Sequence, residues 1–256
     1  MQPFSMIDLA GREEGRLARG VGKVARVAEP IGGGAMAHGG PDSWLDHAVG
    51  LGLHGPVAPQ EIDRLIAFYR ERGARPRIEV ASCADESLLA ALAARGFVLR
   101  SFLHVLARTL DADESFEERL PFGWPRGVEL VRVDPRDDAL VKIFASACTI
   151  GFRPAHEPIA PAIVAFVRAL VASDTVECFL ALIDGEPAGG GCLEIDGDHA
   201  GLITTSVDPR FRGRGIQQAL IAHRLERARA RGAVTAAIAS APGSTTERNA
   251  RRFGFH

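Results

Sequence analysis

No stretch of this sequence reaches the roughly 20 consecutive apolar residues that a membrane-spanning helix needs, and no signal peptide precedes its first polar residues. Cysteine is scarce. The four cysteines are widely scattered, with no C-x-x-C pair and no Cys/His cluster at the spacing of metal ligands. These absences predict a cytoplasmic protein with free thiols, no bound metal and no membrane partner.

An excess of charge of either sign is also missing. The formal net charge is −2, and Lys23 and Lys142 are the only lysines among the 30 basic residues. A chain this close to neutral gives no electrostatic reason to expect nucleic acid as a partner. With 46% hydrophobic and 24% charged residues, the composition is that of a soluble globular protein, and 256 residues allow one or two domains.

The N-terminal half contains two clear helix signals. Apolar residues recur at helical spacing over 58–74 and 85–97, and each pattern ends at a glycine. The first forty residues are weakly patterned, and the glycine-rich segment 29–44 is typical of a turn or loop with possible small strands around it. Strand patterns are expected at 44–53, 75–82 and 98–109.

The C-terminal half is predicted to begin after a linker at 111–126, which is rich in acids and carries two prolines. Two Asp-Gly turns, at Asp184 and Asp196, predict an antiparallel meander. The expected elements are, in chain order, a strand at 128–133, helices at 135–152 and 158–173, three strands within 176–207, a long helix from 216, a strand at 233–240 and a short helix at 243–252.

The sequence also contains an internal repeat. Segments 72–97 and 231–255 share one plan: a helix ending in Arg-Gly-Ala, then a strand, a short helix and a Gly-Phe pair. The matched ends favour a duplication within the chain over a chance likeness.

Two glycines stand at the start of the long helix, where glycine is a poor choice for helix formation. Gly213 and Gly215 are interleaved with Arg212 and Arg214, and no Ser or Asp stands in the usual capping position. A helix start offers about four unpaired N–H groups and a partial positive charge, and glycines let an anion approach the backbone closely. We interpret this turn as an anion site in which the ligand acts as the cap. The Rossmann and P-loop fingerprints are both absent from it.

Val207-x-Pro209, followed by Arg210-x-x-Gly213-x-Gly215 and a long helix, resembles the acyl-CoA-binding motif of the GCN5-related N-acetyltransferases (GNAT). The order of elements from 127 to 256 and the closing Gly-Phe are also similar to that family. The family's fold continues with a final strand after this point, so that strand is expected to be missing or short.

The resemblance implies a co-substrate, acetyl-CoA, and a set of binding residues. The turn amides would hold the pyrophosphate, and the strand through Ser206 and Val207 would pair with the pantetheine arm. Asn249 would lie near the pantetheine or thioester, and Arg252 would reach a phosphate. The cofactor residues implied are Val207, Arg212, Gly213, Arg214, Gly215, Ile216, Gln217, Asn249 and Arg252.

The fold implied is α+β (mixed α/β), with two tandem GNAT-like domains that each hold a mixed, mostly antiparallel twisted sheet flanked by helices. Residues 1–110 would be a degenerate copy without the cofactor motif, 111–126 a linker and 127–256 the domain that binds acyl-CoA. In the first copy, Pro59 and Glu61 stand where the cofactor turn would be. An acid there competes with a phosphate for the helix terminus.

Many family members use a tyrosine on the last helix to protonate the leaving thiolate, but the single tyrosine here, Tyr69, lies in the N-terminal half. Ser244 or water would take that role. Glu194 is the first candidate for the base, with Asp196, His199 and Glu177 behind it, and an ordinary strand position is the alternative for Glu194. Thr205 and Ser206 are candidates for positioning a water. The loop residues Phe152, Arg153 and His156 are candidates for contacting the acceptor.

These features predict an N-acetyltransferase that transfers an acetyl group from acetyl-CoA to an amine of a small molecule or peptide by direct attack. The protein is expected to be a monomer or a homodimer. Two alternatives stay open: a protein that binds acyl-CoA without turnover, and a structural protein in which the turn only caps a helix.

Overall fold

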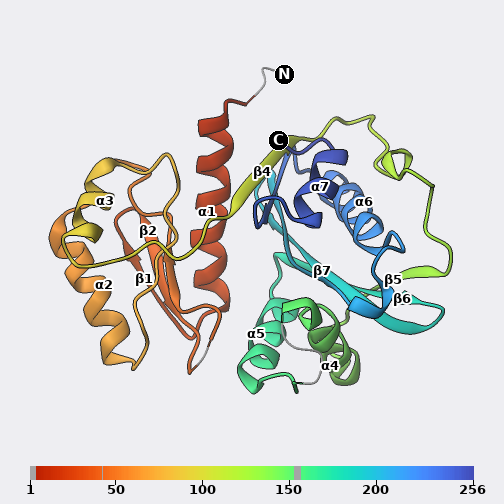
Figure 1. Ribbon diagram of the computed structural model, residues 1–256, viewed down its shortest axis with the longest axis horizontal. Helices are drawn as coiled ribbons and strands as arrows, with labels where there is room; N and C mark the ends of the chain where they lie inside the picture. The colour runs from red at the N-terminus through yellow and green to blue at the C-terminus, as the bar shows by residue number, and fades with distance from the viewer. Residues whose placement is uncertain (1–3, 42, 153–156) are drawn as a thin grey trace. The chain divides into compact units, whose positions relative to one another are not determined.

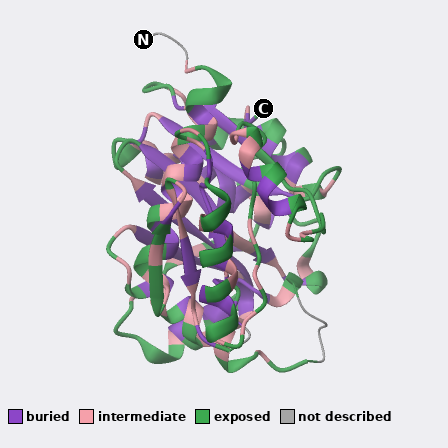
Figure 2. Ribbon diagram, turned by 90° about the vertical axis from the view of Figure 1, so that its left-hand side faces the viewer, coloured by how far each residue is buried: buried purple, intermediate pink, exposed green. Residues whose placement is uncertain are grey.

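The computed structural model describes residues 4–41, 43–152 and 157–256. The chain divides into two compact units, Phe4–Ser101 and Phe102–His256 (Figure 1). In the C-terminal unit the central strands β6, β7 and β8 are largely buried, whereas β1 of the N-terminal unit is mostly exposed (Figure 2). Among the described residues, none of the helices combines the length and the hydrophobicity that crossing a bilayer requires.

The N-terminal unit is built on a three-stranded antiparallel sheet in the order β1-β2-β3. A single parallel bridge joins Ala48 of β3 to Ile78. Within the described residues, the strand expected at 75–82 forms only this one bridge. The predicted helices at 58–74 and 85–97 are confirmed in shorter form. The elements are α1 (Met6–Val24), β1 (Val27–Ile31), β2 (Gly34–His38), β3 (His47–Val49), α2 (Pro59–Glu71) and α3 (Glu86–Ala93).

Helix α1 occupies a region where the sequence showed little periodicity. It begins at a capping box, in which the Ser5 side chain accepts the Asp8 N–H and the Asp8 side chain accepts the Ser5 N–H. Its buried positions include Glu13, Glu14 and Arg16, so the inward face does not appear as an apolar stripe. Helix prediction from periodicity depends on an apolar stripe, so this helix was not predicted.

Glu14 of α1 makes the stability of this unit depend on pH. The residue is 8% exposed, and burial, followed by the charges of Glu13 and Glu79, raises the pKa of its carboxyl to about 7. Since the folded-state pKa lies above the unfolded one, the unfolding free energy is expected to fall as pH rises from about 5 to about 8, by roughly 2–3 kcal/mol. Urea unfolding of the wild type and of Glu14→Gln across this range measures the effect. An equal pH slope in the two proteins would contradict it.

Helix α2 is capped by a carboxylate from its own first turn. Glu61 accepts the N–H of Ala58 through Oε2 at 3.1 Å and the N–H of Gly32 through Oε1 at 2.8 Å. One internal anion therefore holds donors at the helix start and in the β1–β2 turn. The position that the sequence marked as unfavourable for a phosphate is filled by this carboxylate.

The C-terminal unit is a six-stranded sheet in the order β4-β9-β8-β7-β6-β5. The predicted antiparallel meander is confirmed as β6, β7 and β8. Helices α6 and α7 cover one face and α4 and α5 the other (Figure 1). The elements are β4 (His104–Thr109), η1 (Glu117–Arg119), β5 (Val128–Arg132), α4 (Asp138–Ala147), η2 (Ile150–Phe152), α5 (Pro161–Ala172), β6 (Val176–Ile183), β7 (Glu186–Asp196), β8 (His199–Val207), η3 (Pro209–Phe211), α6 (Ile216–Ala230), β9 (Thr235–Ser240) and α7 (Thr245–Arg252).

The expected boundaries, with a first domain to 110 and a linker at 111–126, are corrected by the structure. Strand β4 pairs antiparallel with β9 throughout, with Leu106 opposite Ile238, so the C-terminal unit begins at Phe102. On the other edge of β4, Ala107 exchanges both backbone hydrogen bonds with His256. Strand β4 thus lies between β9 and His256.

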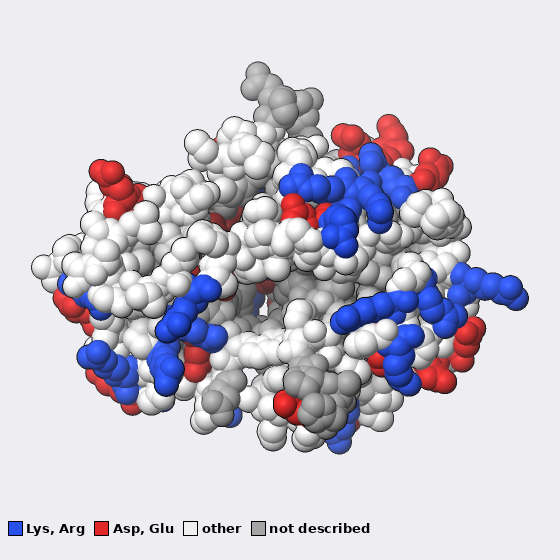
Figure 3. All heavy atoms as spheres, in the orientation of Figure 1, with Lys and Arg blue, Asp and Glu red and all other residues white. Residues whose placement is uncertain are grey.

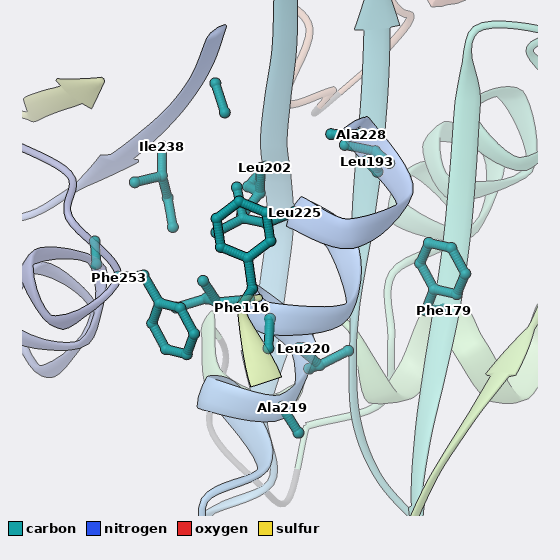
Figure 4. Packing of buried hydrophobic residues seen from close by; sticks show 14 of the residues in the cluster. Phe116, Phe179, Leu193, Leu202, Ala219, Leu220, Leu225, Ala228, Ile238 and Phe253 are labelled. Atoms are coloured by element: carbon teal, nitrogen blue, oxygen red, sulfur yellow. The ribbon is translucent and has the colours of Figure 1, made fainter. Parts of the chain in front are cut away.

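The acidic segment 111–126 packs onto α6 and does not act as a free linker. The Phe116 N–H donates to Glu226 at 2.9 Å, and Arg229 of α6 donates to the carbonyls of Ala112 and Glu114. The Phe116 side chain is fully buried and belongs to the main core. Figure 4 shows it among Leu202, Leu225 and Phe253. Two buried apolar residues, Phe116 and Leu120, anchor this otherwise polar segment in the core, and its composition does not reveal them.

Candidate functional site

Strands β8 and β9 separate partway along their length. They pair in parallel only from His199 opposite Thr235 to Gly201 opposite Ala237. Beyond that point β9 pairs with β4, and within the described residues no further parallel pair joins β8 to β9. The edge of β8 from Leu202 to Val207 therefore offers backbone donors and acceptors to a ligand in extended conformation.

A bulge interrupts β8 along this open edge. Its register against β7 shifts between Gly190 opposite Ser206 and Cys192 opposite Ile203. Thr204, in the bulge, has a φ of 48°, which is rare for a residue other than glycine. The bulge therefore changes the direction of the backbone N–H and C=O groups of β8 in the stretch that no longer pairs with β9.

The glycine turn follows the open edge directly. Asp208 accepts the Arg210 N–H and holds its guanidinium in an ion pair at 2.9 Å. Arg210, Arg212 and Arg214 are all exposed. Gly213 and Gly215 both have a φ of 77°. These angles fit glycine and few other residues.

Helix α6 begins at this turn, and no side chain of the described residues caps it. Its first intrahelical bond runs from the Ala219 N–H to the Gly215 carbonyl. The N–H groups of Ile216 and Gln217 precede that bond and point out of the helix start. The predicted absence of a side-chain cap is confirmed, in contrast to α2 with its Glu61 carboxylate.

The two glycines have different surroundings. A methyl group on Gly215 would approach Pro125 Cγ to 2.8 Å, whereas one on Gly213 would meet no atom within 4 Å. Gly215 is therefore required for packing as well as for its backbone angle. Gly213 faces open space, as expected of a residue that a ligand approaches.

The cofactor residues predicted from the last helix do meet the helix start. Asn249 donates to Gln217 Oε1 at 2.6 Å and accepts from Arg252 at 3.0 Å and from Gln218 at 3.1 Å. Gln217 also donates to Thr246 at 2.8 Å. These bonds fasten α7 to the first turn of α6. Gln217, Asn249 and Arg252, three of the residues predicted around the cofactor, therefore belong to one network at the start of α6.

Of the three catalytic candidates, Glu194 is buried, and Ser206 and Ser244 each accept a hydrogen bond from a backbone N–H group. Glu194 is buried on β7, opposite Gly201, where the pairing of β8 with β9 ends. Ser206 accepts the Gly151 N–H at 2.6 Å and so ties η2 to β8. Ser244 caps α7 by accepting the Glu247 N–H at 3.1 Å.

The weaker candidates for the base lie in other settings. His199 is buried with Nδ1 2.8 Å from Thr235 Oγ1. Burial acts to raise the pKa of Glu177, but hydrogen bonds from Arg227 and Arg231 lower it overall, so this acid is an ionised structural partner. In the loop after α4, Phe152 is exposed. The other two acceptor candidates, Arg153 and His156, lie outside the described residues.

Sequence reasoning missed one residue beside the bulge, Arg224 of α6. Its side chain is fully buried, and its Nη1 donates to Thr205 Oγ1 at 2.8 Å and to the Cys192 carbonyl at 2.9 Å. A signal was present in the sequence, because this arginine interrupts the apolar face of the helix. Because arginine is frequent throughout this sequence, one arginine among the apolar positions of a helix was not recognised as unusual.

Charges of both signs are interspersed over the face shown in Figure 3. Within the described residues, His, Cys, Asp and Glu side chains form no group of three that would hold a metal ion. The four cysteines are free. Cys178 and Cys192 face each other across β6 and β7 with their sulfurs 3.1 Å apart.

Comparison with known proteins agrees with this architecture. Residues 139–255 match the sequence model of the acetyltransferase (GNAT) family. A GCN5-related N-acetyltransferase from Kribbella flavida superposes with a TM-score of 0.69 at 16% identity, over 97% of this chain and 91% of its own. Another from Sphaerobacter thermophilus gives 0.56 at 18% identity, over 82% of this chain and 68% of its own.

A conserved protein of unknown function from Staphylococcus epidermidis gives a TM-score of 0.55 at 12% identity, over 89% of this chain and 88% of its own. No curated protein matches the sequence significantly. At these identities the structural likeness establishes the fold alone. The chain therefore has the GNAT acetyltransferase fold, and residues 139–255 carry the sequence pattern of that family.

Proposed function

We propose that this protein is an N-acetyltransferase that uses acetyl-CoA as its acyl donor. The observation that carries the proposal is the uncapped start of α6, with Gly213 facing open space, directly after the unpaired edge of β8. A pyrophosphate at the turn would receive the free N–H groups and the positive end of the helix dipole. The pantetheine arm would then pair along β8 toward the bulge.

In this proposal the site residues have distinct roles. Arg212, Arg214 and the amides from Gly213 to Gln217 bind the pyrophosphate, and Val207 pairs with the arm. The network of Asn249, Arg252 and Gln217 holds α7 against the bound cofactor. The residue types present fit an anionic, extended ligand, because donors and cations gather at one end and unpaired strand backbone lies at the other.

The chemistry proposed is direct attack of an amine on the thioester carbonyl. Glu194 accepts the proton that the amine loses, either directly or through a water held by Ser206. Backbone N–H groups at the bulge of β8 stabilise the oxyanion. The acceptor is an amine of a small molecule or a peptide, and Phe152 lies in the loop that would contact it.

We further propose that the N-terminal unit is a degenerate copy of the same fold. Its order β3, α2, bridge strand at Ile78 and α3 repeats the order β8, α6, β9 and α7. At the start of α2, the Glu61 carboxylate occupies the place that a phosphate would need. One acetyl-CoA per chain is the expected stoichiometry.

Removing the Glu61 carboxylate is expected to destabilise the N-terminal unit without changing acetyl-CoA affinity. Glu61→Ala leaves the N–H groups of Gly32 and Ala58 without their acceptor, which costs about 1 kcal/mol of unfolding free energy. Urea unfolding and calorimetric titration measure the two quantities. Glu71→Ala, at the exposed end of the same helix, is the matched control. A change in acetyl-CoA affinity on Glu61→Ala would contradict the assignment of the cofactor to the other unit.

Isothermal titration with acetyl-CoA tests the binding function directly, and a stoichiometry of one is expected. Thiol release on addition of a panel of amines then tests the transferase. Absence of binding would overturn the whole proposal.

A second candidate function is a protein that binds acyl-CoA without turnover. It is favoured by the absence of tyrosine from the C-terminal unit. Binding with no thiol release for any amine would select this second function.

A further inference from the structure

Among the described residues, no acidic side chain forms an ion pair with Arg224. Its side chain is 0% exposed, and its guanidinium is held by neutral acceptors: the carbonyls of Leu220, Cys192 and Ile203 and the hydroxyl of Thr205. Within the described part of the chain, Nη2 has no hydrogen-bond partner. Burial lowers the pKa of Arg224 to about 10, so the group stays charged at neutral pH. Burying an unpaired charge is costly, and a structural role alone does not call for a cation here.

The guanidinium lies within the bulge of β8. Three of its acceptors, on Cys192, Ile203 and Thr205, surround the point where the register of β7 and β8 shifts. Gly191 leaves the space for it, because a methyl group there would lie 2.9 Å from Nη1. The charge is thus fixed at the stretch of β8 that has parted from β9.

Thr205 connects this charge to the open edge of β8. Its Oγ1 accepts from Arg224 Nη1 at 2.8 Å, which occupies an oxygen lone pair and leaves the O–H to donate. The partner that this hydroxyl has within the chain is the Ile203 carbonyl, at a long 3.3 Å. Thr205 is only partly buried. Its hydroxyl is therefore polarised by a cation and only weakly engaged as a donor within the chain.

We propose that the Thr205 hydroxyl donates a hydrogen bond to the sulfur of the leaving thiolate, with Arg224 as the positioning residue that holds and polarises it. The inference rests on the proposed function. An arm that starts at the glycine turn and runs back along β8 brings its thioester end to this bulge. The donor would act where other members of the fold use a tyrosine, which the C-terminal unit lacks.

The step balances without a further reactant. The amine nitrogen bonds to the carbonyl carbon, the carbon–sulfur bond breaks, and its electron pair stays on sulfur. Glu194 takes the proton that the amine loses and passes it to water. The thiolate leaves while hydrogen-bonded to Thr205 and takes up a proton from solvent. A hydrogen bond to an ionised group is stronger than one to a neutral group, so the contact favours the products of bond cleavage.

The test needs no acceptor, because it follows the thiol of bound CoA. Ultraviolet absorbance of the thiolate is titrated in the complex of CoA with the full chain, and a titration of the protein alone is subtracted to remove its own cysteines. For the wild type, we expect the pKa of the bound thiol to lie about one unit or more below its value in solution. Thr205→Ser, which keeps the hydroxyl, is expected to retain that shift, and the isosteric Thr205→Val to lose it. Arg224→Met is expected to lose it as well.

The outcomes separate this inference from the proposed function. If CoA does not bind the wild type, the proposed function fails. If CoA binds and its thiol titrates as in solution, or if Thr205→Val keeps the shift, the inference is overturned and the binding function stands. Thermal unfolding of each variant is measured alongside. Should Arg224→Met fail to fold, the Thr205 pair still decides the question, since both replacements fit the same space.

Discussion

Gly213→Val is expected to weaken acetyl-CoA binding at least about 100-fold. A side chain at this position projects into the space in front of the α6 N-terminus, where we place the pyrophosphate. The φ of 77° is also unfavourable for a β-branched residue, so the backbone is expected to shift and misdirect the N–H groups of the turn. Losing two or three charge-assisted hydrogen bonds accounts for an effect of this size. Calorimetric titration of the folded variant measures it.

Gly197→Val is the matched control for this experiment. Gly197 lies in the hairpin between β7 and β8, with a φ of 60° and no atom within 4 Å of an added methyl group. Both substitutions place a β-branched residue at positive φ in open space, so both are expected to cost about 1–3 kcal/mol of stability. Only the change at Gly213 is expected to affect binding. Equal affinities in the two variants would rule out the turn as the phosphate site. Gly215 is less useful for this purpose, because a substitution there also collides with Pro125.

Phe116→Ala is expected to lower the unfolding free energy of the C-terminal unit by about 3–5 kcal/mol. The ring is fully buried in the main core beside α6 (Figure 4). Its loss removes apolar contact area and leaves a cavity that the surrounding leucines fill only in part. Urea unfolding measures the change. A result this large would show that the segment before β5 is part of the folded unit, where its composition predicted a linker.

Phe122→Ala provides the comparison within the same segment. Phe122 is 97% exposed, so its removal is expected to change the unfolding free energy by less than about 0.5 kcal/mol. The two substitutions delete the same group from positions six residues apart in the printed sequence. Similar effects for both would mean that Phe116 is not anchored in the core.

Local signals predicted the elements that contain them. The Asp-Gly turns mark the meander of β6, β7 and β8, and the glycines before α6 mark a helix start without a side-chain cap. Such signals act through the conformations open to a few neighbouring residues. Helix α1 was missed because its inward face includes Glu13, Glu14 and Arg16, and a pattern of apolar residues does not represent a buried ion pair.

The sequence by itself determined the order of elements in the C-terminal half, a start of α6 that no described side chain caps, and the acid Glu61 in the first turn of α2. Each of these depends on residues close together in the chain. The tertiary structure alone decided that β4 pairs with β9, that β8 leaves β9 after Gly201 and that Arg224 lies in the bulge of β8. These contacts join residues far apart in the chain. Such contacts are stabilised by the burial of apolar surface and by strand pairing in the assembled sheet, and neither can be predicted from a short stretch of sequence.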